Sequence, residues 1–505
     1  METLNEVLDY HERTKHRPSR YAASLGYMDW STQPNPFRYY SGCDRIVLTH
    51  DTLSVPYSAL FSPQTLPKAP LCLESISHLL RYSLGLAAWK HYGPSRWALR
   101  CNASSGNLHP SECYLITPSF GSGEFPAALM HYAPREHVLE VLHSLETSDT
   151  GDESKGFYLI LNSVLWREAW KYGERSWRYC QLDAGHAYEA IRLSAASLGW
   201  HCRILPVDSD TIAHACGTDQ CQRFHPEECE SPDMILWISS ETDRPTFELP
   251  KLPVLASQAN RLSPSHHSWP ILEQIDRATR GLYPPHRPLG RNRKTPPSTA
   301  PSSEVILKRR SAQMMDQSGI DEASFRRLLD ASLFCDTSGD VHFILFVHRV
   351  EGLEKGMYLF IRNPQDETLL RNSLQADFLW KDCGEGFYLL RSGDCRGQAQ
   401  YISCNQEIAR DGAFSFGMLC RFSSVLEEEG AIGYKALYHQ CGAIGQTMYL
   451  EATSMGLSAT GIGCFLDDEI HALLGISSER PFQSLYHFTI GRAVVDTRIA
   501  TGPPY

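Results

Sequence analysis

A long apolar-faced stretch that leads into a glycine-rich turn is the clearest hydrophobic pattern in this chain. Apolar residues at spacings of four and three predict a helix that carries Met448, Ala452 and Met455 on one face. Gly456 stands where a left-handed helix cap is expected, and the turn at residues 461–463 lies beyond it. Glycine permits positive φ, so we expect this turn to bring backbone N–H groups against a flat ligand. Taken alone, the pattern also fits a tight connection into a buried strand.

The same pattern occurs earlier in the chain, which indicates an internal repeat. DAGHAYEAIRLSAASLGW around Gly185 aligns with QCGAIGQTMYLEATSMGL around Gly442, and in both a glycine is expected to start the helix. Upstream, CNASSGNLHP from Cys101 resembles CDTSGDVHF from Cys335, and each leads into a strand-like run. Two similar halves predict a pseudo-dimer within one molecule.

Short runs of β-branched and aromatic residues alternate with the helical stretches and predict strands. They read VLTH, CYLIT, GFYLILNSV and MILWIS in the first half, then HFILFV, GMYLFI and HFTIGRAVV in the second. This alternation predicts the α+β class, with a central sheet covered by helices in each half.

A stretch rich in proline and small polar residues separates the halves and reads as a linker. One amphipathic piece inside it, WPILEQIDRA from Trp269 to Ala278, predicts a short helix. The predicted domains are residues 1–252 and 304–505, joined by the linker 253–303.

Composition narrows the classes of function. The chain has 505 residues, of which 42% are hydrophobic, and its formal net charge is -11, which argues against a nucleic-acid partner. The N-terminus lacks an apolar signal region, and no apolar run is long enough to span a membrane, so we expect a cytoplasmic protein.

The 16 cysteines include no CxxC pair, so we expect mostly buried thiols in a reducing compartment. One group of soft-metal ligand types matches no standard zinc spacing, and the sequence leaves open whether it binds metal. We assign no metal ligand to this group, which comprises His214, Cys216, Cys221, His225 and Cys229.

Three motifs together carry a resemblance to a known family. They are Arg100 with the serine-rich run 103–107, the segment Lys308-Arg309-Arg310-Ser311, and the helix that leads to the turn at 461–463. This ordered set resembles the nitroreductase-like flavoprotein superfamily, in particular its SagB-type dehydrogenase branch, which oxidises azolines to azoles in ribosomal peptides. The resemblance implies a tandem form: two nitroreductase-like domains, each with a mainly antiparallel sheet.

The resemblance also implies that FMN is bound between two domains, one supplying the basic motif and glycine turn and the other the serine loop. Arginine pairs and hydroxyl groups suit a terminal phosphate. The halves are unequal, however. The second has a degraded serine loop at 337–340, whereas the first opens only with Arg13-Thr14-Lys15 and carries Trp200, His201 and Pro206 in place of the glycine turn.

We therefore predict one composite flavin site, and an empty or vestigial pseudo-symmetric one. Arg498 matches a basic position that similar proteins place on the FMN phosphate, although it also fits an exposed cap on the last strand. The predicted FMN-binding residues are Arg309, Arg310, Ser311, Gln313, Gly461, Ile462, Gly463 and Arg498 from the second half, with Arg100, Ser104, Ser105 and Asn107 from the first.

Lys171 and Tyr172 are the predicted catalytic residues, because the SagB-type branch resembles this chain in having a Lys-Tyr pair before the helix. Azoline oxidation needs a base that removes a carbon-bound proton, and a lysine with a lowered pKa can serve. The alternative is a solvated face formed by Lys171, Glu174 and Arg175. Asp183 and His186 read as helix N-terminal caps.

The leading prediction is thus an FMN-dependent oxidoreductase of the SagB type, acting on a small-molecule or peptide substrate. One alternative is an NAD(P)H-dependent nitro or quinone reductase, and another is a non-catalytic flavin-binding or partner protein in a biosynthetic complex. The sequence does not identify the substrate, the electron donor or acceptor, or the oligomeric state beyond the pseudo-dimer.

Overall fold

The structure is a computed structural model that describes residues 2–50, 54–120, 125–146, 155–241, 244–291, 294–335, 338–477 and 479–505. The chain folds into two compact units. Unit 1 comprises Met1–Ala23, Pro284–Ser298 and Lys308–Thr497, and unit 2 comprises Ser24–Tyr283, Thr299–Leu307 and Arg498–Tyr505.

Both chain ends belong to units other than those expected from the domain boundaries 1–252 and 304–505. Helix α1 (Glu2–Arg13) packs in unit 1, where His11 hydrogen bonds to Tyr434 and Gln483 at 3.1 and 3.0 Å. Strand β21 (Ala500–Gly502) extends a small antiparallel sheet of unit 2. That sheet also contains β3 (Leu86–Tyr92) and β4 (Ser95–Arg100). Specific polar contacts and strand pairing decide these placements, and linear position in the sequence does not reveal them.

Among the described residues, unit 2 contains a seven-stranded sheet in which every neighbouring pair is antiparallel. From edge to edge its strands are β2 (Asp44–Val47), β7 (Val138–Ser144), β6 (Ala128–Ala133), β5 (Ser111–Thr117), β8 (Gly156–Val164), β10 (Glu230–Ser239) and β9 (His201–Ile204). The apolar runs around residues 111–117, 156–164 and 230–239 are buried along their whole length, as expected for central strands covered on both faces.

Unit 1, over its described residues, repeats this architecture with a second seven-stranded antiparallel sheet. Its strands, in order, are β16 (Lys381–Asp382), β17 (Phe387–Ser392), β15 (Gly356–Phe360), β13 (Val341–Val347), β18 (Phe414–Arg421), β20 (Phe482–Gly491) and β19 (Ser458–Ile462). The α+β class, with two large antiparallel sheets covered by helices, is confirmed.

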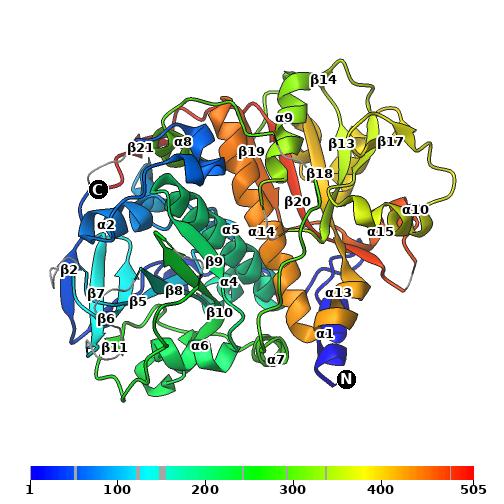
Figure 1. Cartoon of the computed structure of the whole chain (residues 1–505). Coiled ribbons are helices and arrows are strands. Elements are labelled where there is room, and N and C mark those ends of the chain that lie inside the picture. The colour runs from blue at the N-terminus through cyan, green and yellow to red at the C-terminus, as the bar shows by residue number, and fades with distance from the viewer. Residues whose placement is uncertain are drawn as a thin grey trace. The chain divides into compact units, whose positions relative to one another are not determined.

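Each sheet is covered by a long buried helix, α5 (Ser176–Ser197) in unit 2 and α14 (Ala431–Ser454) in unit 1 (Figure 1). The other helices among the described residues of unit 2 are α2 (Leu73–Arg81), α4 (Leu165–Tyr172), α6 (Ser209–Cys216), α7 (Pro270–Ala278) and most of α8 (Ser302–Lys308). Unit 1 adds α9 (Glu322–Ser332), α10 (Glu367–Ser373), α11 (Arg396–Ile402), α12 (Ile408–Asp411), α13 (Phe422–Glu429) and α15 (Asp467–Leu474). No helix of the described ranges is both long and apolar enough to cross a membrane.

The two units match in the order of their elements and also in the lengths and ends of equivalent helices. Strand β8 runs through α4 into α5, and β18 runs through α13 into α14. Helices α4 and α13 each have 8 residues and end at a glycine with positive φ, Gly173 and Gly430. The long helices also end alike, because Gly199 and Gly456 follow them with φ of 69° and 71°. Equivalent positions of the two units can therefore be paired residue by residue.

The predicted start of the two long helices is wrong. Gly185 and Gly442 lie inside α5 and α14, which begin at Ser176 and Ala431. The expectation failed because glycine weakens a helix by only about 1 kcal/mol, and burial on nearly all sides outweighs that cost here.

Candidate functional site

The basic motif and the glycine segment of unit 1 meet at Tyr449, a buried residue of α14. The Tyr449 hydroxyl accepts the N–H of Gly461 at 2.8 Å and shares a hydrogen bond of 2.8 Å with the Ser311 hydroxyl. The guanidinium of Arg309 lies 5.1 Å from the centre of the Tyr449 ring, within cation–π distance. We call Arg309, Ser311, Tyr449 and Gly461 the tyrosine-centred half-site. Sequence reasoning did not single out Tyr449, although it is the only aromatic residue in the segment TMYLEA.

The remaining predicted residues of unit 1 flank this half-site. Ser311 forms a parallel bridge with Ala459, and the Ala312 N–H donates to the Ala459 carbonyl at 3.1 Å, so the basic motif runs beside β19. Arg310 is half-buried and donates to the Arg309 carbonyl at 2.6 Å. Gln313 is exposed, Ile462 is buried in β19, and Gly463 is half-buried just after it.

Gly461 is not the turn glycine that the sequence suggested. It lies in β19 opposite Phe488, and neither it nor Gly463 is among the described glycines with positive φ. Its lack of a side chain has a steric reason: a Cβ here would lie 1.9 Å from the Tyr486 hydroxyl oxygen and 3.2 Å from the Phe488 ring. The expectation of positive φ is therefore wrong.

Gly461→Ala is expected to destabilise unit 1 by about 1–3 kcal/mol, because the rigid Tyr486 ring must move to admit a methyl group. It should also weaken FMN binding, which is measured by quenching of FMN fluorescence alongside thermal melting. Gly456→Ala is the matched control: its φ of 71° makes alanine cost about 1–2 kcal/mol, but nothing lies within 4 Å of the added Cβ. Equal FMN affinity in the two variants would contradict the assignment of Gly461.

In unit 2, the serine loop is fixed by Asp183, a buried residue of α5. Asp183 accepts the Ser105 N–H at 3.0 Å and the Ser105 hydroxyl at 2.9 Å. Burial raises the pKa of Asp183 to about 7, although hydrogen bonds from Ser104 and Ser105 oppose this. The predicted role of Asp183 and His186 as N-terminal caps is wrong, because both lie well inside α5.

Left-handed backbone shapes the rest of the loop. Gly106, Asn107 and His109 have φ of 58°, 60° and 52°. The Asn107 amide donates to the Ala98 carbonyl at 2.9 Å, and its oxygen lies 3.0 Å from His109 Nε2. Left-handed backbone at the two non-glycine residues, Asn107 and His109, costs free energy, and such strain is often found at ligand sites.

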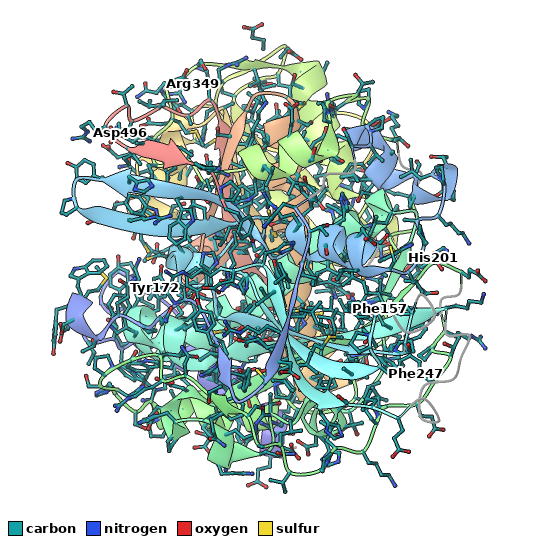
Figure 2. The ribbon with its side chains drawn as sticks, turned by 90° about the vertical axis from the view of Figure 1, so that its left-hand side faces the viewer. Phe157, Tyr172, His201, Phe247, Arg349 and Asp496 are labelled. Carbon is teal, nitrogen blue, oxygen red and sulfur yellow. The ribbon has the colours of Figure 1, made fainter. Side chains whose placement is uncertain are left out.

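The predicted catalytic pair lies against this loop. A Cβ on Gly106 would lie 2.7 Å from the Tyr172 hydroxyl oxygen and 3.2 Å from Lys171 Nζ, so only glycine allows the pair to approach so closely. Both side chains are half-buried at the end of α4, where Figure 2 labels Tyr172. The alternative of a solvated face is wrong, because Glu174 and Arg175 are buried. The serine loop and the Lys-Tyr pair thus form a second half-site, which we call the serine-loop half-site.

The two remaining predicted arginines, Arg100 and Arg498, lie in different surroundings. Arg100 is buried in unit 2 and donates to the carbonyls of Ser111 and Pro36 at 3.3 and 2.5 Å. Burial lowers its pKa to about 10, so it keeps its charge at neutral pH. Arg498 is exposed and lies over the Tyr92 ring, 5.9 Å from its centre.

The counterpart of the serine-loop half-site in unit 1 has different chemistry. Equivalent helix positions place Glu428 and Glu429 where unit 2 has Lys171 and Tyr172, and Gln440 where it has Asp183. Gln440 still holds the loop, because its side-chain oxygen accepts the Asp340 N–H at 3.2 Å. The counterpart has therefore exchanged a basic residue for acidic ones.

The linker packs over this acidic counterpart within unit 1. A cavity of about 340 Å³ here is lined by the segment 284–287 together with Asp340, Glu428 and Glu429, among others. Arg287 pairs with Asp366 at 2.6 Å, and its carbonyl oxygen would lie 2.1 Å from a Cβ on Gly339. The linker backbone thus rests directly on the degraded serine loop.

The five possible metal ligands noted in the sequence do not gather. Cys216 points back to the Ile212 carbonyl, and His214 pairs with Asp219 at 3.1 Å. Among the described residues a different group forms: ligand atoms of His225, Glu228 and His266 lie within 4.8 Å of one another. Glu228 also accepts main-chain N–H groups of residues 262 and 263, so this group braces a loop and we assign it no metal.

Comparisons with known proteins agree with the fold. The Nitroreductase family model matches residues 306–492, a segment that includes the basic motif and Gly461. A candidate nitroreductase from Anabaena variabilis is 22% identical with a TM-score of 0.72, covering 97% of this chain and 99% of its own.

Two further solved structures match parts of the chain. A candidate nitroreductase from Ralstonia eutropha is 17% identical over 44% of this chain and 98% of its own, with a TM-score of 0.30. A chain of the E. coli microcin synthetase McbBCD complex is 19% identical over 48% of this chain and 94% of its own, with a TM-score of 0.28. No curated protein sequence matches.

Proposed function

We propose that this chain is an FMN-dependent oxidoreductase of the SagB-type dehydrogenase class, acting on a small or peptide-borne substrate such as an azoline. The observation that carries the proposal is the contact of Lys171 and Tyr172 with Gly106 of the serine loop. It brings a candidate base and a phenol to a loop whose counterparts in similar proteins edge the flavin.

The hydrogen-bond donors of the basic motif suit the phosphate of FMN. Arg309, Arg310 and Ser311 offer two guanidinium groups and a hydroxyl, which are good partners for a phosphate. We propose one FMN for each chain, with its phosphate held by the basic residues of the tyrosine-centred half-site. When bound, FMN supplies a hydride acceptor.

The protein's own contribution is proton chemistry and positioning. The Lys171 amine takes the proton from the substrate carbon, and the Tyr172 hydroxyl hydrogen bonds along the same proton path. Asp183 keeps the loop in place through its hydrogen bonds to Ser105. The direct test is to incubate FMN-loaded protein with an azoline-containing peptide and to follow the loss of two hydrogen atoms by mass spectrometry. Rapid bleaching of the flavin by NAD(P)H with no azoline oxidation would instead favour a nitro or quinone reductase.

Purified protein reconstituted with FMN is expected to hold one flavin per chain. The unit 1 counterpart has Glu428 where unit 2 has Lys171, so it lacks the candidate base, and the linker segment 284–287 packs over it. The number of flavins per chain is measured by dividing the flavin concentration, obtained from absorbance after denaturation, by the protein concentration. A ratio near two would contradict the single site, and protein that takes up no FMN would contradict the enzyme proposal.

A further inference from the structure

The serine loop of unit 2 is held at two points before the chain enters β5. The Ser105 N–H donates to the Asp183 carboxylate at 3.0 Å, near the start of the loop. At its end, the Pro110 carbonyl accepts the N–H of Val164, the residue that precedes α4, at 2.9 Å. The next residue, Ser111, begins β5.

In unit 1 a single residue, Asp340, makes both of these contacts. Its N–H donates to the Gln440 side chain at 3.2 Å, as that of Ser105 does to Asp183. Its carbonyl accepts the N–H of Arg421, the residue that precedes α13, at 2.9 Å. The next residue already begins β13. Residues 106–110 of unit 2 therefore have no equivalent in unit 1.

The linker backbone packs against this shortened loop. A Cβ on Gly339 would lie 2.1 Å from the carbonyl oxygen of Arg287, so the two backbones are in direct contact. The amide of Asn363, which is 0% exposed, donates to the carbonyls of Gly339 and Pro288 at 3.0 and 3.2 Å. One buried side chain thus ties the linker and the loop together.

The Arg287 side chain fixes the linker to the body of unit 1. Its guanidinium makes two hydrogen bonds to the two oxygens of Asp366, at 2.6 and 2.9 Å, and a third to the Gly339 carbonyl at 3.3 Å. Asp366 is 5% exposed and also pairs with His342 at 3.1 Å. Two-point pairing of arginine with a carboxylate is among the stronger polar contacts in proteins and fixes the direction of the side chain.

We propose that the segment 284–288 is a strap that takes the place of the missing loop residues of unit 1, with Arg287 as its clasp. In unit 2, Gly106 of the corresponding stretch contacts the Lys-Tyr pair. In unit 1 the strap instead lines the cavity beside Glu428 and Glu429. The chain itself therefore closes this counterpart, and the closure depends on contacts within unit 1.

Hydrogen–deuterium exchange of the full chain, read by mass spectrometry, tests the strap without flavin or substrate. In Arg287→Ala, peptides that cover the strap and peptides that cover residues 338–340 should both exchange about tenfold faster or more, because charged hydrogen bonds are lost. Strand β13 should keep its exchange rate. The matched control is Arg277→Ala, which removes an exposed pair with Glu273 on α7 and should leave both segments unchanged.

Two further variants separate the clasp from the backbone contact. Arg287→Lys keeps the charge but cannot form the two-point pair, so its exchange should lie between those of the wild type and Arg287→Ala. Gly339→Ala keeps the clasp, but its methyl group would collide with the Arg287 carbonyl, so it should also speed exchange in the strap.

Three results would overturn the proposal. The first is unchanged exchange of both segments in Arg287→Ala, and the second is faster exchange of the strap while residues 338–340 stay protected. The third is an equal rise in strand β13, which would mean that Arg287 stabilises unit 1 as a whole. Because no turnover is measured, a wild type that fails to oxidise azolines would reject the proposed function and leave this test intact.

Discussion

Replacing Lys171 by methionine is expected to lower kcat for azoline oxidation by about 10²–10⁴-fold while FMN stays bound. The magnitude is that of a lost general base, and methionine keeps the length of the side chain but cannot accept a proton. FMN should remain because the predicted phosphate donors, Arg309, Arg310 and Ser311, belong to the other half-site. Single-turnover oxidation of an azoline peptide measures the rate, and the flavin absorbance of the same sample measures retention.

The control for this variant is Lys155→Met. Lys155 is exposed and pairs only loosely with Glu241, so its loss should leave both the rate and the flavin content unchanged. If Lys171→Met oxidised the peptide as fast as the wild type, Lys171 would not be the base, whatever its position beside Gly106.

Replacing His131 by leucine is expected to cost about 3 kcal/mol of stability in unit 2. The imidazole of His131 is fully buried between Glu112 and Glu140, at 3.0 and 3.1 Å, and its loss leaves two buried carboxylates with fewer partners. Glu112 keeps an ion pair with Arg167, and Glu140 keeps one with Arg45 at 2.8 Å, which limits the loss. Chemical denaturation followed by tryptophan fluorescence measures this loss of stability.

The same histidine should make stability depend on pH. Burial alone would lower its pKa, but the hydrogen bonds and charges of Glu112 and Glu140 outweigh burial and raise it to about 9. A histidine whose pKa is raised by folding contributes fully below its unfolded pKa and loses that contribution as pH rises through about 9. The wild type should therefore weaken between pH 7 and pH 10, and His131→Leu should show a flatter profile there.

The exposed pair of His214 and Asp219 supplies the comparison. His214→Leu is expected to change stability by less than about 0.5 kcal/mol, because solvent screens an exposed pair. Equal losses for His131→Leu and His214→Leu would mean that the buried network contributes no more than a surface contact.

The strands were predictable because their signal is local. The apolar runs at residues 156–164 and 342–347 coincide with β8 and with most of β13, and the cap predicted at Gly456 is present with φ of 71°. Periodicity and cap residues depend on neighbours a few positions away, so they survive without tertiary information. The helix starts were missed because burial, not the local preference of Gly185 and Gly442, decides how far those helices extend.

The candidate site was predictable in its residue types and not in its geometry. Ser105 and Lys171 were both noted in the sequence, but Asp183 looked like a helix cap because nothing local shows that it holds a loop 78 positions away. Tyr449 was missed for the same reason: its partners Ser311 and Gly461 lie 138 and 12 positions away. Gly461 was singled out in the sequence for its expected φ, but its constraint is a neighbouring ring and not its own φ.

By itself, then, the sequence determined the α+β class, the internal repeat and the inequality of its halves, because each is recorded in patterns of nearby residues. Only the tertiary structure decided that α1 packs in unit 1 and β21 in unit 2, and that Tyr449 joins the basic motif to Gly461. It also decided that Asp183 holds Ser105 of the serine loop, whereas Gln440 takes its place in the other unit. Such facts depend on side chains brought together across long stretches of chain, and no local pattern carries them.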